Sequence, residues 1–169
     1  MRIEPPTSGP ELAQLTALLD FQRGTVLLET EGLSAEQLAQ PLPPSTLTLG
    51  GLLNHLALVE DSWFRVRFAG LPDDEPWAGI DWDADPDHEF RTAAELTPDE
   101  LRRRYRETCA RSREVVAAAD SLDQLSVEKR RNGEHFDLRW MLLHLIEETA
   151  RHAGHADLLR EAVDGSIGE

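Results

Sequence analysis

Residues 137–162 read DLRWMLLHLIEETARHAGHADLLREA and predict the longest helix of the chain. The apolar side chains of this segment recur every three or four positions, which is the spacing of one helix face. Gly165 follows shortly afterwards and is a typical helix stop. No alternation of useful length that would indicate a β-strand appears here or elsewhere in the chain. This segment therefore points to an all-α fold.

Three further long helices are predicted before it. They cover residues 10–32, 46 or 48 to 68, and 97–119. The third begins at Thr97-Pro98-Asp99-Glu100, where threonine suits the N-cap, proline the first helical position and glutamate the third. A second capping-box sequence, Ser34-Ala35-Glu36-Gln37, predicts one short helical turn that Pro41 cuts off. Together these elements predict one domain, residues 1–169, folded as an antiparallel four-helix bundle.

The segment between the second and third predicted helices, residues 71–95, is of a different kind. Acidic residues crowd there, and Trp77, Trp82 and Phe90 lie among them. A segment this long without helical periodicity is usually functional or mobile. We therefore expect a long acidic loop that lies apart from the candidate ligand-binding residues.

The overall composition excludes several classes of protein. The chain has 169 residues, with 17 lysines and arginines against 32 acidic residues and a formal net charge of −15. Such a chain lacks the clustered cations that neutralise nucleic-acid phosphates or anionic lipids, so neither partner is expected. Because no run of about 18 apolar residues and no hydrophobic N-terminal signal occurs, we expect a cytoplasmic protein without membrane spans. Cys109 is the only cysteine, which excludes disulfide scaffolds and multi-cysteine metal sites.

One face of the last predicted helix mixes polar and apolar side chains. Its polar members are His144, Glu148, His152 and His155. At 100° per residue these four span an arc of about 80°, which Met141 and Leu159 share. This stripe of side chains along the helix is therefore predicted to face the protein interior, where polar side chains need hydrogen-bond or metal partners. A shared metal ion is one such partner, and hydrogen bonds to core neighbours are the alternative.

Glu148 and His152 are the strongest candidates for metal ligands on this face. Their i, i+4 spacing places two potential ligands on the same helix face, one turn apart. His55 lies on the apolar side of the second predicted helix, over Leu52 and Val59, and completes a His-Glu-His set. Three protein ligands leave one coordination position open, as in catalytic zinc sites. Imidazole and carboxylate ligands suit zinc, nickel, iron or cobalt alike, and the ligand types do not choose among them. Our expectation is zinc, with nickel or iron as alternatives.

The spacing of the ligands excludes two common kinds of metalloprotein. There is no His-Glu-x-x-His sequence, so the helix of the zinc proteases is absent. There is also no Glu-x-x-His sequence, which excludes the ferritin-like di-iron carboxylate proteins. Two alternatives stay open for the His-Glu-His set: metal ligands, or core side chains bonded to their neighbours.

Two further histidines are candidates for supporting roles. His144 and His155 flank the Glu148–His152 pair by about one helical turn on either side. Hydrogen bonding to the ligands or proton transfer near the metal is one interpretation. Core packing for one of them, and solvent exposure at the end of the bundle for the other, is the alternative.

Three other residues are candidates for substrate binding. Arg151 is a potential anchor for a substrate carboxylate, with a surface ion pair as the alternative. Trp63 and Trp82 are candidates for the wall of a substrate pocket. Core packing is the alternative for Trp63, whereas Trp82 lies on the acidic segment together with Trp77.

Two stretches of the sequence resemble the DinB-like metalloenzymes. The run LGGLLNHL (residues 49–56) resembles the second helix of that superfamily, and residues 135–155 resemble its last helix. The closer likeness is to the metal-binding domain of mycothiol-dependent maleylpyruvate isomerase. In that branch one histidine and a Glu-x-x-x-His pair hold the metal, and these positions fall on His55, Glu148 and His152. Other branches use three histidines.

This resemblance implies a four-helix bundle of the DinB or YfiT type, often a homodimer, that binds a divalent metal. Better-understood members use low-molecular-weight thiols such as mycothiol or bacillithiol, as S-transferases or thiol-dependent isomerases. The resemblance therefore implies a metal-dependent thiol transferase whose partners are a thiol and a small electrophile, with detoxification as the setting. Two alternatives stay open: a metal-dependent hydrolase, and a non-catalytic metal-binding module with a stress or interaction role.

Overall fold

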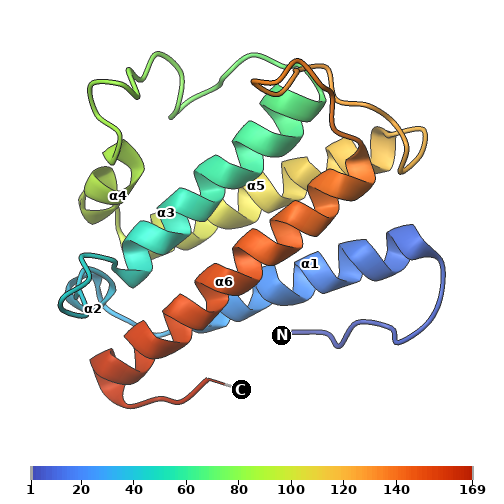
Figure 1. The fold of residues 1–169 in the computed structure, drawn as a ribbon. Helices are drawn as coiled ribbons and strands as arrows, with labels where there is room; N and C mark the ends of the chain where they lie inside the picture. Colours follow the sequence, from blue (N-terminus) through green and yellow to red (C-terminus); the bar gives the residue numbers. More distant parts are fainter. Residues whose placement is uncertain (1, 169) are drawn as a thin grey trace.

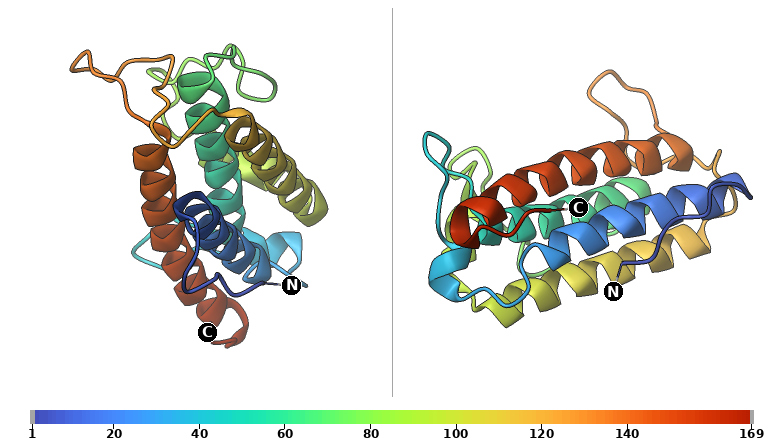
Figure 2. Two further views of the ribbon diagram at one scale, coloured as in Figure 1. Left: turned by 90° about the vertical axis from the view of Figure 1, so that its right-hand side faces the viewer. Right: turned by 90° about the horizontal axis from the view of Figure 1, so that it is seen from below.

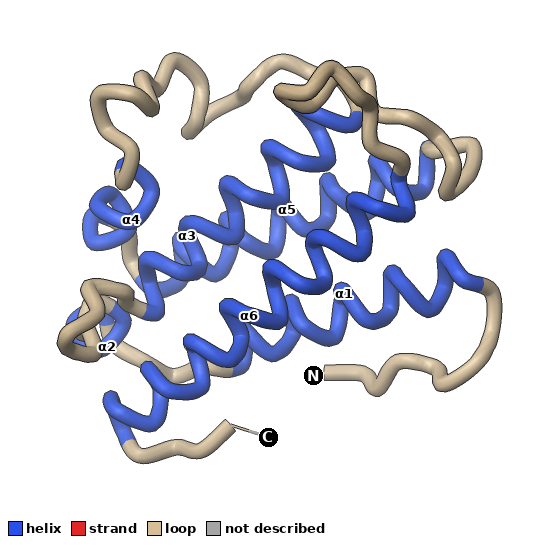
Figure 3. Tube along the Cα trace, in the orientation of Figure 1, coloured by secondary structure: helices blue, strands red, loops and turns tan. Residues whose placement is uncertain are grey.

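The chain folds into helices and loops. The structure is a computed structural model that describes residues 2–168. Its helices are α1 (Glu11–Leu28), α2 (Ala35–Leu38), α3 (Leu49–Glu60), η1 (Asp61–Phe68), α4 (His88–Thr92), η2 (Ala93–Glu95), α5 (Pro98–Ala118) and α6 (Leu138–Asp164). Within these residues the only β-type pairing is one isolated bridge between Leu125 and Asp137, so the all-α prediction is confirmed (Figure 3). None of the helices described is both long and apolar enough to cross a membrane.

Four of the helices, α2, α3, α5 and α6, begin at a capping side chain. Thr48 and Asp137 each accept a hydrogen bond from the backbone N–H three residues further on, at 3.0 and 2.7 Å. The capping boxes predicted at Ser34 and Thr97 both form. The left-handed φ of Gly165, +80°, ends α6. The backbone N–H and C=O groups at helix ends lack partners within the helix, and the residues that satisfy them therefore set most of the boundaries.

α1 ends one turn before the predicted stop. The sequence predicts an end near Gly32, whereas the helix ends at Leu28. Beyond that point the backbone N–H groups of Thr30 and Glu31 bond to carbonyls three residues back, at 3.2 and 3.0 Å. This tighter pattern replaces the α-helical one in the last turn before Gly32 takes a φ of +74°.

The second long helix changes geometry along its length. α3 passes directly into η1, a π-helical segment, so the helix continues to Phe68 as predicted. At its end the backbone N–H of Ala69 bonds to the carbonyl of Phe64, five residues back, at 3.1 Å. This wider turn departs from the 3.6-residue register of an α-helix, which is why sequence periodicity does not reveal it.

Four long helices lie side by side: α1, α3 with η1, α5 and α6 (Figures 1 and 2). α1 packs along α6, α3 packs along α5, and α3 also meets α6. Two clusters of buried apolar side chains lie among them. One includes Leu52 and Tyr105, and the other includes Phe64, Met141 and Leu142. The contact between α3 and α6 is the one that positions the candidate site.

The segment between η1 and α5 is more ordered than the sequence indicates. Residues 88–95 are helical, as α4 and η2, so the helix-free part is limited to residues 71–87. Trp77, expected on an acidic loop, is 3% exposed and belongs to a core cluster. The guanidinium of Arg104 lies 5.5 Å from the centroid of its ring. Burial of this indole holds the segment against the long helices, and α4 packs on α3 (Figure 1).

Candidate metal centre

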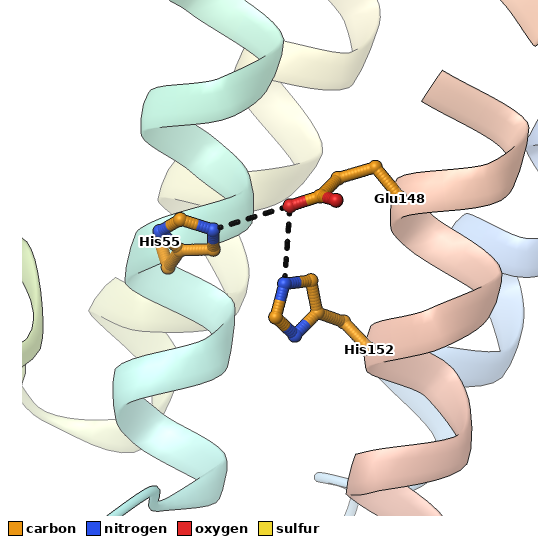
Figure 4. Close-up of side chains that lie close together, drawn as sticks. All are labelled: His55, Glu148 and His152. Carbon is orange, nitrogen blue, oxygen red and sulfur yellow. Dashed lines mark hydrogen bonds and ion pairs between the residues drawn. The ribbon is translucent and has the colours of Figure 1, made fainter. Parts of the chain in front are cut away.

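His55, Glu148 and His152, hereafter the triad, lie together where α3 faces α6 (Figure 4). Oε1 of Glu148 lies 3.2 Å from Nε2 of His152 and 3.6 Å from Nε2 of His55. One potential ligand atom from each residue lies within 4.8 Å of the other two. The structure therefore brings together the three residues that the sequence singles out as candidate metal ligands.

A glycine near the start of α3 explains how the imidazole of His55 is held. Gly51 lies one turn before His55, and a Cβ atom on it would lie 3.1 Å from Cδ1 of Phe90. Because glycine has no Cβ, the ring of Phe90 approaches α3 closely. It stacks on the imidazole of His55 with ring centroids 4.9 Å apart and an interplanar angle of 16°. The LGGLLNHL run thus leaves room for α4 to cover one face of the ring.

α4 also brings a carboxylate to the site. Oε1 of Glu89 lies 3.0 Å from Nδ1 of His55, and the Glu89 side chain is only 6% exposed. Its Oε2 is buried without a hydrogen-bond partner among the described residues. Asn54 donates a 2.7 Å hydrogen bond to the backbone carbonyl of Glu89, and Arg104 donates one of 2.7 Å to Asn54. A carboxylate on the second nitrogen of a metal-binding histidine fixes both its tautomer and its orientation.

The histidines and carboxylates of the site shift one another's pKa values. Burial lowers the pKa of His55, but hydrogen bonds to Glu148 and Glu89 outweigh burial and raise that pKa to about 9. Hydrogen bonds from His152 and His55 in turn hold the pKa of Glu148 well below its usual range. A proton on His55 and a divalent cation are therefore alternative ways to balance the carboxylates.

The donor set of the triad fits a divalent transition metal. Two imidazoles and one carboxylate are ligand types that zinc, nickel and iron all accept. The three side chains are only 12% to 19% exposed, so water screens their interactions little. The orphaned oxygen of Glu89 adds negative charge next to His55, which favours a cation at this place.

Two more of the predicted residues contact the triad. Nδ1 of His155 lies 3.3 Å from Nδ1 of His152. Arg151 bonds to the exposed Glu147 at 2.7 Å, and another of its nitrogens lies 3.7 Å from Oε2 of Glu148. That oxygen is the one that does not face the histidines. His155 and Arg151 are thus placed beside the ligands, and their roles in function stay predictions.

Three other predicted residues make their ring contacts outside the triad. His144 stacks on Trp140 with ring centroids 5.1 Å apart, and Trp63 approaches His144 at 4.6 Å. Trp82 packs against His88, with centroids 5.9 Å apart. Within residues 2–168 no hydrogen bond or ion pair joins His144, Trp63 or Trp82 to the triad. The placement of His144 therefore favours ring packing over support of the ligands.

One residue of the site, Glu89, has no sequence signal strong enough to identify it. The acidic segment is expected to lie apart from the ligands, and for Glu89 that expectation is wrong. Its contact with His55 joins positions 34 residues apart and depends on the formation of α4. The sequence does contain one sign of the helix that carries Glu89: Phe90 and Ala93 are three residues apart, which is typical of one helix face.

The chain also matches a known family. The model of a family described as Mycothiol-S-transferase matches residues 14–165. The matched stretch contains the triad together with Glu89 and Phe90, and it covers α2 to α6 completely. A search of curated proteins finds no match.

Proposed function

Because this chain belongs to the mycothiol-S-transferase family, a DinB-like family, we propose that it transfers a mycothiol-type thiol to a small electrophile. The observation that supports metal dependence is the triad, whose potential ligand atoms lie within 4.8 Å of one another. We propose that His55, Glu148 and His152 hold a divalent cation, with zinc as the first choice.

The nucleophile in this proposal is a cosubstrate thiol. A divalent cation held by the triad supplies Lewis acidity, which favours the thiolate form of a thiol. The protein's own cysteine is unsuited to the task, because Cys109 is 2% exposed and burial raises the pKa of its thiol. A low-molecular-weight thiol, as the family description names, meets the requirement.

The residues around the triad have separate tasks. Glu89 accepts the Nδ1–H bond of His55, which leaves Nε2 of the same ring directed toward Glu148. Phe90 stacks on one face of that ring and limits its rotation. His155 contacts Nδ1 of His152 and leaves Nε2 of that ring directed toward Glu148 as well. The protein thus fixes both imidazoles before any substrate binds.

The proposed transfer needs no redox partner. A bond forms between the thiol sulfur and the electrophilic carbon, while the bond from that carbon to its leaving group breaks. The leaving group departs with the electron pair, and the thiol proton passes to solvent. The chain orients the reactants and stabilises the charge that develops on them, and these two effects lower the barrier most in reactions of this kind.

Family membership also supports a finer description of the fold. We propose that α1, α3 with η1, α5 and α6 form the antiparallel four-helix bundle of DinB-like proteins. The side-by-side arrangement of these helices supports this assignment (Figure 2). In such a bundle the triad joins the second and fourth long helices.

A thiol-transfer assay tests the proposed function. The zinc-loaded chain is mixed with mycothiol and 1-chloro-2,4-dinitrobenzene, and formation of the thioether is followed by absorbance. We expect Glu148→Gln to lower the rate about 100-fold, the scale of losing a key electrostatic group. Glu147→Gln is the matched control, because that neighbouring carboxylate is 64% exposed and lies outside the triad.

Two outcomes would contradict the proposal. One is a transfer rate no greater than that of mycothiol and the electrophile alone. The other is an undiminished rate in Glu148→Gln. Zinc-dependent ester hydrolysis in the absence of thiol, without transfer in its presence, would instead support the hydrolase alternative.

A further inference from the structure

An aromatic cluster lies next to the triad along the junction of η1 and α6. It consists of Trp63, Phe136, Trp140 and His144. The ring of Trp63 lies 5.3 Å from that of Phe136 and 5.7 Å from that of Trp140. His144 precedes Glu148 by one helical turn, so the cluster begins on the order of 6 Å along α6 from the triad.

Two arginines stack on the tryptophans of this cluster. The guanidinium of Arg67 lies 4.5 Å from the ring centroid of Trp63, and that of Arg130 lies 4.8 Å from Trp140. Backbone pairing brings the two arginines to the same end of η1, because the N–H of Glu128 bonds to the carbonyl of Arg67 at 2.9 Å. Trp63, Trp140 and Arg67 are half-buried, and Arg130 is exposed.

These arginines differ from most others in this acidic chain. Most arginines within residues 2–168 form ion pairs with carboxylates. In the same part of the chain, Arg67 and Arg130 have no carboxylate within ion-pair distance. Lys129 and Arg131 adjoin Arg130, so residues 128–134 carry three cations against the two carboxylates of Glu128 and Glu134. In a chain of net charge −15, cations without an ion-pair partner are therefore gathered at the end of η1.

Stacking on indole prepares a guanidinium for binding. The stacked plane has lost part of its rotational freedom, so less entropy is lost when its N–H groups bond to a ligand. The edge of the plane presents two parallel donors, which match the two oxygens of a carboxylate. The exposed face of the plane also accepts a second flat ring. These properties select ligands that are both planar and anionic.

We propose that Arg67 and Arg130, held by Trp63 and Trp140, bind the carboxylate of a planar ligand. The ligand is thus an aromatic or conjugated carboxylate. Trp140 precedes Glu148 by eight residues, on the order of 12 Å along α6, so this site lies apart from the triad. The proposed site rests on the two arginines and does not depend on the proposed transfer.

Calorimetric titration with unreactive probes tests the site directly. The zinc-loaded chain is titrated with 3,5-dinitrobenzoate and, separately, with uncharged 1,3-dinitrobenzene, in the absence of any thiol. We expect the carboxylate to bind at least tenfold more tightly. Arg67→Gln and Arg130→Gln should each weaken carboxylate binding about tenfold, the scale of one lost charged hydrogen bond, and leave the uncharged probe unaffected.

Two further variants separate binding from folding. Arg67→Lys keeps the charge but loses the planar pair of donors, so we expect an affinity between those of Arg67→Gln and the unmodified chain. Arg106→Gln removes an exposed arginine of α5 and should change neither affinity. Thermal unfolding of every variant checks that the fold is intact.

The inference is overturned if the two probes bind equally, if neither binds, or if both glutamine variants keep the affinity for the carboxylate. These outcomes are distinguishable from failure of the proposed function. Transfer to 1-chloro-2,4-dinitrobenzene without preferential carboxylate binding would refute only the anion site. Carboxylate binding that depends on Arg67 and Arg130, in a chain that transfers no thiol, would refute only the transferase assignment.

Discussion

Oε1 of Glu89 lies 3.0 Å from Nδ1 of His55, so a residue of the acidic segment orients a candidate metal ligand on α3. The contact leaves Nε2 of the same ring directed toward Glu148, 3.6 Å away. Because the Glu89 side chain is only 6% exposed, water competes little for the contact. Three elements that are distant in sequence, α3, α4 and α6, therefore define one site.

Replacement of Glu89 tests whether it positions His55. Glu89→Ala should weaken zinc binding about 10- to 100-fold, the usual cost of losing such a partner. Glu89→Gln keeps an oxygen that accepts the Nδ1–H bond, so we expect a smaller loss. Competition with a fluorescent zinc chelator measures both affinities, and Glu95→Gln on the exposed side of η2 is the control. Undiminished zinc affinity in Glu89→Ala would rule out the positioning role.

Zinc binding should release a proton from His55 at neutral pH. Burial disfavours the charged ring, but Glu148 and Glu89 raise the pKa of His55 to about 9, so the metal-free site is protonated at pH 7. Zinc binds neutral imidazole and must displace that proton. The apparent affinity should therefore rise about tenfold per pH unit above pH 7 and level off near the pKa of His55.

Titration calorimetry in two buffers of different ionisation enthalpy counts this proton. The carboxyl of Glu148 contributes none, because its pKa is held well below its usual range and it is already ionised. We expect about one proton from His55 for each zinc ion bound. A binding heat that is the same in both buffers would contradict the raised pKa.

Gly51→Ala tests the close approach of α4 to α3. The added Cβ would lie 3.1 Å from Cδ1 of Phe90 and 3.0 Å from Oγ1 of Thr48. We expect the free energy of unfolding to fall by about 1–3 kcal/mol, as for other overpacked sites, and zinc affinity to fall because Phe90 moves off His55.

The matched control is Gly154→Ala, on α6. A Cβ on Gly154 meets nothing within 4 Å, so alanine should be neutral there or stabilise the chain by up to ~1 kcal/mol. Chemical denaturation measures both variants. Equal unfolding free energies for Gly51→Ala and Gly154→Ala would mean that the contact with Phe90 does not depend on the glycine.

Part of this structure follows from local sequence alone. The i, i+4 spacing of Glu148 and His152 within an apolar stripe predicts a shared face, because the helical repeat fixes it. Thr48, Thr97 and Asp137 predict where helices begin, because a cap satisfies backbone donors only a few residues away. Features that depend on neighbours within one turn are therefore predictable.

Other features depend on contacts between distant segments. Glu89 reaches His55 only because α4 forms and packs on α3, and the sequence predicts a loop there instead. His144 shares the stripe of Glu148, yet its partners are the rings of Trp140 and Trp63. Helical periodicity gives the face of a residue but not the neighbour that meets it. The grouping of His55 with the α6 pair follows from the apolar face of its own helix, and the family resemblance assigns the same three residues.

The metal content of the triad variants tests the central claim most directly. The chain is purified without chelator, incubated with zinc, passed through a desalting column and analysed by mass spectrometry of the elements. We expect about one zinc per chain in the unmodified protein and in the control Glu147→Gln, and below ~0.1 in Glu148→Gln and His152→Ala. Full zinc content in Glu148→Gln and His152→Ala, or none in the unmodified chain, would contradict a metal centre built from His55, Glu148 and His152.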